Sequence, residues 1–221
     1  MRKAISIIRD EHRSIAAILH GMEFLVNEIK ARDAAIDARV FRAMLYYLDT
    51  FAERLHHPKE DQYLFAPMRR RGSEANALIE ALEREHASGE RSLQHLEQHL
   101  VRYEEGGERE FPEFHEAVVQ FVACYREHIR KEEEEMFPLA ERMLTDADWE
   151  AASGPFEENR DPLVTGPAAK DFDRLFERIV NLAPAPIGLG SKSGLGSKSG
   201  LGSKSGLDSK SGPGSASRGK H

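Results

Sequence analysis

Two short stretches of the chain combine imidazole and carboxylate groups at the same spacing. His56 and Glu60 recur 72 residues later as His128 and Glu132, and a phenylalanine follows each pair at the same distance. Residues four apart in a helix are turned by only about 40° and lie one turn apart, so each pair shares a face. A single such pair usually makes a solvated hydrogen bond. Two copies favour a metal cluster instead, since these ligands suit iron, zinc, copper or manganese.

Two further histidines fall on apolar stripes of the chain. His12 interrupts a stripe between Ile5 and Ile29, and His86 interrupts one between Ile79 and Leu100. His56 and His128 continue the apolar faces of two more segments. The steps of three and four residues in these stripes predict amphipathic helices at about 3–31, 37–71, 73–103 and 112–141. Each predicted helix therefore carries one histidine on its buried face.

The four histidines are predicted to lie in one layer. If the helices run up, down, up and down, a rise of about 1.5 Å per residue places all four at about 10 to 14 Å above the start of the first helix. Four coincident heights favour a shared metal site over four independent core histidines. The remaining histidines of the first 145 residues are expected outside the site, His57 less firmly because Pro58 should widen the turn beside it. These are His20, His57, His95, His99 and His115.

The predicted fold class is all-α, an up-down-up-down four-helix bundle with a short fifth C-terminal helix and a disordered tail. Residues 1–145 form the bundle, 146–187 an extension in which a short helix around Phe172 to Ile179 packs on the bundle, and 188–221 the tail. The tail repeats GLGSKS, a composition that cannot build a core. Thr145 is expected to cap only a short turn.

Composition narrows the classes of partner. The 221 residues carry a net charge of -7, but the tail holds six Lys or Arg and one Asp, so the remaining body is at -12. An acidic body argues against nucleic acid as the main partner and fits the handling of cations. The sequence has neither an apolar run that could span a bilayer nor a signal peptide, so we expect a cytoplasmic protein without a membrane partner. The single cysteine, Cys124, excludes an internal disulfide and is expected to be a small core residue.

Six ligands are too many for one tetrahedral zinc ion. If both glutamates bridge two ions and each ion also binds two of the four histidines, every ion has four protein ligands. A solvent-derived bridge adds a fifth, and one position stays open to a small molecule. The expected ligands are His12, His56, Glu60, His86, His128 and Glu132.

This arrangement resembles the hemerythrin superfamily, in particular its HHE cation-binding domains, over residues 5–142. The resemblance implies a four-helix bundle with two non-haem iron ions (Fe2+/Fe3+) on those six residues. Unlike the oxygen-carrying hemerythrins, the chain has Glu90 in place of a second histidine on the third helix, and Glu132 lies four residues after its histidine, where the carriers have an aspartate at five. These differences predict that the reduced protein consumes its oxidant and does not release dioxygen intact.

Several functions are compatible with these residues. The leading hypothesis is a diiron protein that binds, senses or reacts with dioxygen, peroxide or nitric oxide, and a peroxide-consuming or oxidase activity is the enzymatic form of it. Iron handling or the repair of iron–sulfur clusters under nitrosative or oxidative stress is an alternative. A bundle stabilised by zinc is another, because the same ligands accept zinc. Metal analysis would separate these hypotheses best.

Overall fold

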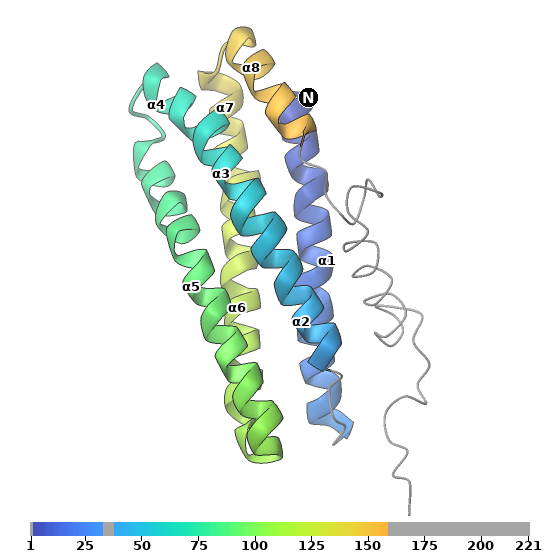
Figure 1. Cartoon of the computed structure of the whole chain (residues 1–221). Helices are drawn as coiled ribbons and strands as arrows, with labels where there is room; N and C mark the ends of the chain where they lie inside the picture. Colours follow the sequence, from blue (N-terminus) through green and yellow to red (C-terminus); the bar gives the residue numbers. More distant parts are fainter. Residues whose placement is uncertain (1, 33–37, 159–221) are drawn as a thin grey trace, which may run out of the picture.

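The computed structural model describes residues 2–32 and 38–158. This part of the chain is helical almost throughout and contains no strand, which confirms the predicted all-α class. Four long helical stretches lie side by side (Figure 1). The first is α1 (Lys3–Arg32), and the third is α5 (Asn76–Gly106), which a short 3-10 turn η3 (Gly107–Glu110) joins to the fourth. Within the described residues, no helix is both long enough and apolar enough to cross a membrane.

The second and fourth stretches each change helix type where the metal site was predicted. The second consists of α2 (Ala38–Tyr47), the π-helical η1 (Leu48–His56), α3 (His57–Glu60), the π-helical η2 (Asp61–Phe65) and α4 (Ala66–Arg71). The fourth consists of α6 (Phe111–Lys131), the π-helical η4 (Glu132–Met136) and α7 (Phe137–Met143). Wide π turns inside α-helices are frequent at functional sites. The widened turn expected beside Pro58 is therefore confirmed.

The apolar core consists of two clusters. Each of the four stretches passes from one cluster to the other at its histidine: Ile8 and Ile15 flank His12 in this way, and Leu82 and Leu93 flank His86. Between the clusters the described chain buries a set of polar residues that lie close together. They are Glu11, His12, His56, His57, Glu60, His128 and Glu132. The predicted layer of histidines is therefore present in the structure.

A further helix, α8 (Asp146–Glu157), packs on α1 and replaces the short turn expected after Thr145. The Thr145 side chain accepts from the Asp148 backbone N–H, and the Asp148 side chain accepts from Thr145 in return, a capping box that starts the helix. Trp149, Ala152 and Phe156 bury the inner face of α8. The helix expected near Phe172–Ile179 and the predicted tail lie outside the described residues.

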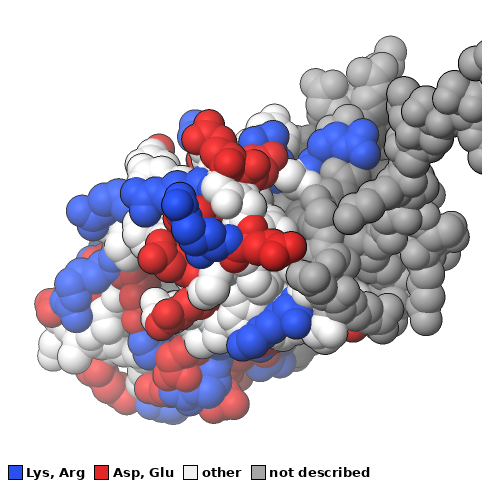
Figure 2. Space-filling model, turned by 90° about the horizontal axis from the view of Figure 1, so that it is seen from below, with Lys and Arg blue, Asp and Glu red and all other residues white. Residues whose placement is uncertain are grey.

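Charges of both signs are mixed on the surface. On the face shown in Figure 2, Lys and Arg side chains alternate with Asp and Glu and form no continuous basic patch. The prediction for Cys124 is wrong, because this residue is exposed on α6 and is not part of the core.

Candidate metal centre

The first group of possible ligands comes from α1 and from both regions with π turns. His12, His56, Glu60 and Glu132 each offer one nitrogen or oxygen, and these four atoms all lie within 4.8 Å of one another. All four side chains are at most 2% exposed. Each reaches the interior from the point where its stretch passes between the two apolar clusters. Sequence reasoning predicted all four.

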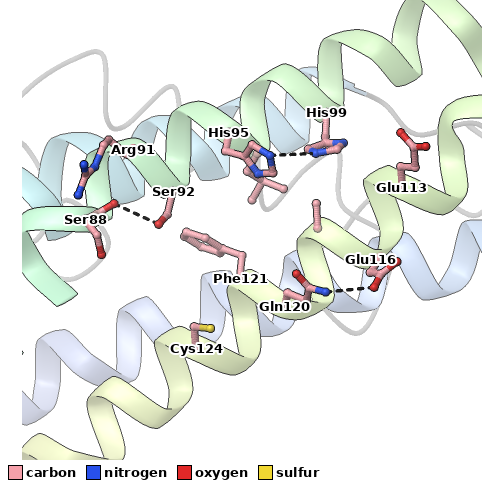
Figure 3. Close-up of a pocket in the computed structure, with 12 residues that line it drawn as sticks. Ser88, Arg91, Ser92, His95, His99, Glu113, Glu116, Gln120, Phe121 and Cys124 are labelled. Atoms are coloured by element: carbon pink, nitrogen blue, oxygen red, sulfur yellow. Dashed lines mark hydrogen bonds between the residues drawn. The ribbon is translucent and has the colours of Figure 1, made fainter. Parts of the chain in front are cut away.

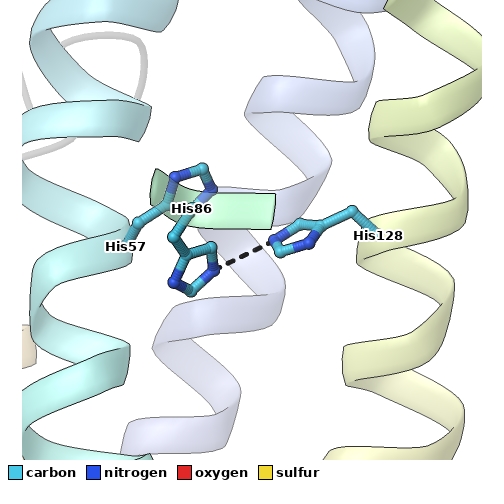
Figure 4. A group of neighbouring side chains, drawn as sticks. All are labelled: His57, His86 and His128. Atoms are coloured by element: carbon cyan, nitrogen blue, oxygen red, sulfur yellow. Dashed lines mark hydrogen bonds between the residues drawn. The ribbon is translucent and has the colours of Figure 1, made fainter. Parts of the chain in front are cut away.

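The second group consists of three histidines, His57, His86 and His128, on α3, α5 and α6. Their rings converge in the space between these helices (Figure 4). His86 Nε2 lies 3.2 Å from His128 Nε2, and the rings of His57 and His86 stack at 4.2 Å between centroids. His57 was expected outside the site, but the residue is only 4% exposed. The π turns that bracket α3 change the angle between consecutive side chains, so both His56 and His57 face inward.

Glu132 belongs to the first group but also faces the histidines of the second. Its Oε2 is 3.2 Å from His12 Nε2, while its Oε1 is 3.4 Å from His128 Nε2 and 3.6 Å from His86 Nε2. One oxygen therefore faces each group, as a carboxylate that bridges two ions requires.

Glu60 has a similar position on the opposite stretch. Its Oε1 lies 3.9 Å from His12 Nε2, and its Oε2 lies 3.4 Å from His56 Nε2 and 3.8 Å from His86 Nε2. The two glutamates thus lie near histidines of both groups. They come from two different helical stretches, the second and the fourth. This is the arrangement expected from the repeated spacing in the sequence.

All five histidines have a carboxylate oxygen at Nδ1, which fixes the ring. Four of them, His12, His56, His86 and His128, direct Nε2 toward Glu60 or Glu132, and the outer carboxylate makes this inner nitrogen a better ligand. The Nδ1 partners are Glu133 for His12 (3.0 Å), Glu11 for His56 (2.7 Å), Glu53 for His57 (3.2 Å), Asp61 for His86 (2.8 Å) and Glu85 for His128 (2.9 Å). Sequence reasoning missed these five carboxylates, because all but Glu53 belong to a different stretch from the histidine that they contact.

The buried polar atoms at the centre fit a bound cation. His12 Nε2 and all four carboxylate oxygens of Glu60 and Glu132 are inaccessible to solvent and have no hydrogen-bond partner within the described chain. Such atoms are costly to bury unless something satisfies them. Imidazole nitrogens and carboxylate oxygens are the ligands of iron, zinc and manganese, so metal ions are the group that these residues fit.

The two glutamates differ in protonation when no cation is present. Burial raises the pKa of Glu60 well above its usual value, and the neighbouring Glu132 raises it further. Burial also acts to raise the pKa of Glu132, but the positive charges of His128, His12 and His86 hold it well below its usual value. In the metal-free protein, a proton is therefore held more readily by Glu60 than by Glu132. Two cations would supply the positive charge that lets both ionise.

Two histidines carry protons that a metal would displace. Burial lowers the pKa of His12, but the nearby carboxylates of Glu132 and Glu133 outweigh it and raise the pKa to about 9. In the same way, Asp61 and Glu132 raise the pKa of His86 to about 9 against the effect of burial. Metal binding requires both rings to be deprotonated at the inner nitrogen, so it must release these protons.

A buried polar assembly supports His57 from the outer side. The Tyr125 hydroxyl lies 3.2 Å from His57 Nε2 and donates to Glu53 Oε1 over 3.3 Å. The Glu53 carboxylate lies against α5 at Gly89, where a Cβ atom would overlap Oε2 and lie 2.7 Å from Oε1. Burial, the largest effect, raises the pKa of Glu53 to about 7. Gly89 therefore leaves the space that Glu53 occupies.

The structure brings the six residues predicted from the sequence into one layer and adds His57 to them. Glu90, which stands in place of the second histidine of the oxygen carriers, is exposed and belongs to neither group. His20 and His95 are exposed, and His99 and His115 also lie outside both groups, as expected. The consecutive histidines before Pro58 were the sequence signal for the additional residue, since a distorted turn can direct two neighbours inward.

Comparison with protein families gives one match. The family model described as the hemerythrin HHE cation binding domain matches residues 3–140, which is more than half of the chain and includes all seven residues of the two groups. Neither the curated proteins nor the solved structures contain a match to this chain.

Proposed function

We propose that this chain, which belongs to the hemerythrin family of HHE cation-binding domains, is a non-haem diiron protein that binds, senses or reacts with dioxygen or a related small oxidant. The observation that carries the proposal is the pair of fully buried glutamates, Glu60 and Glu132, whose oxygens face histidines of both groups and lack other partners. The proposal takes the four long stretches to be the expected up-down-up-down bundle.

The residues divide between two ions. His12 and His56 would hold one, His86 and His128 the other, and Glu60 and Glu132 would bridge them. His57, which belongs to the second group, is a seventh candidate that sequence reasoning excluded less firmly than the other histidines. Six or seven nitrogen and oxygen donors exceed what one tetrahedral zinc ion accepts, which supports two ions.

The surrounding side chains would keep the site dry and rigid. The Phe137 ring stacks on His12 at 5.9 Å and the Phe65 ring stacks on His86 at 5.7 Å, each between centroids and with planes within 12°. The outer carboxylates hold the rings in the orientation that directs Nε2 inward. When bound, two iron ions would supply the redox chemistry that a small oxidant such as dioxygen, peroxide or nitric oxide requires.

His57 bears on the expected fate of the oxidant. The expectation that dioxygen is consumed rested on the absence of a second histidine on the third helix, and His57 now offers an additional donor beside His86. We retain the proposal that the iron-loaded protein would consume air or peroxide and not release dioxygen intact, because Glu60 and Glu132 would both place negative charge on the site. Mixing the reduced protein with oxygen and then purging with argon tests this, and a return of the reduced spectrum would contradict it.

Metal analysis tests the proposal directly. Protein produced with ample iron should contain two iron ions per chain, and Glu132→Ala should disturb both, since the bridge serves both ions. Glu134→Ala is the matched control, because Glu134 is exposed in the same run and pairs with Arg130. Two tightly bound iron ions with an unchanged optical spectrum in Glu132→Ala would refute the bridge. Zinc in place of iron, under the same conditions, would favour the zinc-stabilised bundle.

A further inference from the structure

A groove on the surface contains metal-ligating side chains that belong to neither group of the buried centre. It lies between α5 and α6, has a volume of about 580 Å³, and shares no residue with the buried centre. His95 and His99 line its α5 side, and Glu113 lines its α6 side (Figure 3). Nothing in the proposed function of the buried centre uses these residues.

The two histidines are already placed as a chelate. They lie four residues apart on one face of α5, and their Nε2 atoms are 3.3 Å apart. Two nitrogens bound to one tetrahedral zinc ion at about 2.0–2.1 Å would be separated by about 3.3–3.4 Å. The rings cross at 76°, which keeps them from stacking face to face. Both nitrogens can therefore bind one ion with little movement of either ring.

The charge of the groove also suits a cation. Two carboxylates, Glu113 and Glu116, line the groove together with one guanidinium, Arg91. The charged side chains of the lining are therefore negative in sum, which attracts a cation.

We propose that His95 and His99 bind one divalent late-transition-metal ion, of which Zn2+ is the best fit, with water in the remaining positions. The site is open to solvent, so its ion exchanges freely. Imidazole nitrogens are common ligands of zinc.

Equilibrium dialysis of the iron-loaded protein against Zn2+ tests the site, with iron and zinc measured in the same sample. We expect the wild type to bind one zinc ion that His99→Ala and His95→Ala bind about 100-fold more weakly, because each loses the gain of two linked ligands. The iron content should be the same in all of these proteins. Far-UV circular dichroism should be unchanged, since both rings lie at the surface of the helix.

A further variant decides whether the binding is specific. His115→Ala removes a histidine of α6 that lies outside the groove, and it should bind zinc as the wild type does. Equal zinc binding in the wild type and His99→Ala, or equal loss in His115→Ala, would overturn the proposal.

Discussion

Gly89 offers a sharp test of the assembly beside the buried centre, although no atom of Gly89 is a ligand. Replacing glycine by alanine inside a helix ordinarily stabilises the protein by about 1 kcal/mol. Here the new Cβ would overlap the Glu53 carboxylate, whose side chain is only 6% exposed. The carboxylate must therefore move away from His57 and Tyr125, with which it now forms hydrogen bonds.

The cost of that movement exceeds the gain in helix propensity. Leaving His57 Nδ1 buried without its partner costs about 1–3 kcal/mol, and the lost Tyr125 hydrogen bond costs about 1 kcal/mol. Subtracting the favourable term of about 1 kcal/mol, we expect Gly89→Ala to lower the free energy of unfolding by about 1–3 kcal/mol.

A double-mutant cycle with Glu53→Ala isolates the effect. In the Glu53→Ala background the overlap is absent, so Gly89→Ala should stabilise the protein by about 1 kcal/mol, and the difference between the backgrounds measures the coupling. Urea unfolding of the metal-free protein followed by circular dichroism gives all four values. Stabilisation by the same amount in both backgrounds would refute the reasoning.

Three further predictions concern metal and chain length. Loading the metal-free protein with metal should release protons at pH 7, because the pKa values of His12 and His86 are about 9. For the same reason, metal affinity should rise between pH 7 and pH 9. A pH indicator in weak buffer measures the release of protons, and zero release would contradict the assignment. His57→Ala should keep two iron ions, since six ligands remain, but change their optical spectrum; an identical spectrum would remove His57 from the ligand set. A chain that ends at Ile187 should keep its iron and its thermal unfolding midpoint, because the low-complexity repeat is not expected to contribute to the core. Loss of iron or a lower midpoint would show that the tail docks on the body.

The sequence was sufficient for the layer of histidines because two regular quantities determine it. The rise per residue set the heights of His12, His56, His86 and His128, and the apolar stripes set their direction. The extent of each long helix followed from the same stripes, and the structure agrees with the expected ranges to within a few residues at each end.

The features that the sequence did not reveal depend on departures from regular helices or on distant contacts. His57 was misjudged because 100° per residue holds only for an α-helix, and π turns flank it on both sides. The partner of His128, Glu85, comes from a different stretch, and nothing local marks it. Cys124 was placed in the core because cysteines usually lie there, but its position on α6 faces the groove.

The complete burial of Glu60 and Glu132 would also determine how fast a bound metal ion is exchanged. Apolar clusters lie on both sides of the layer, so the packed helices obstruct a chelator. Release would then wait for a local opening of the helices, whose frequency depends on the free energy of that opening. Above a modest concentration, a stronger or more abundant chelator would therefore remove metal no faster. The lifetime of the loaded centre is set by the motions of the protein, separately from its equilibrium affinity for the ions.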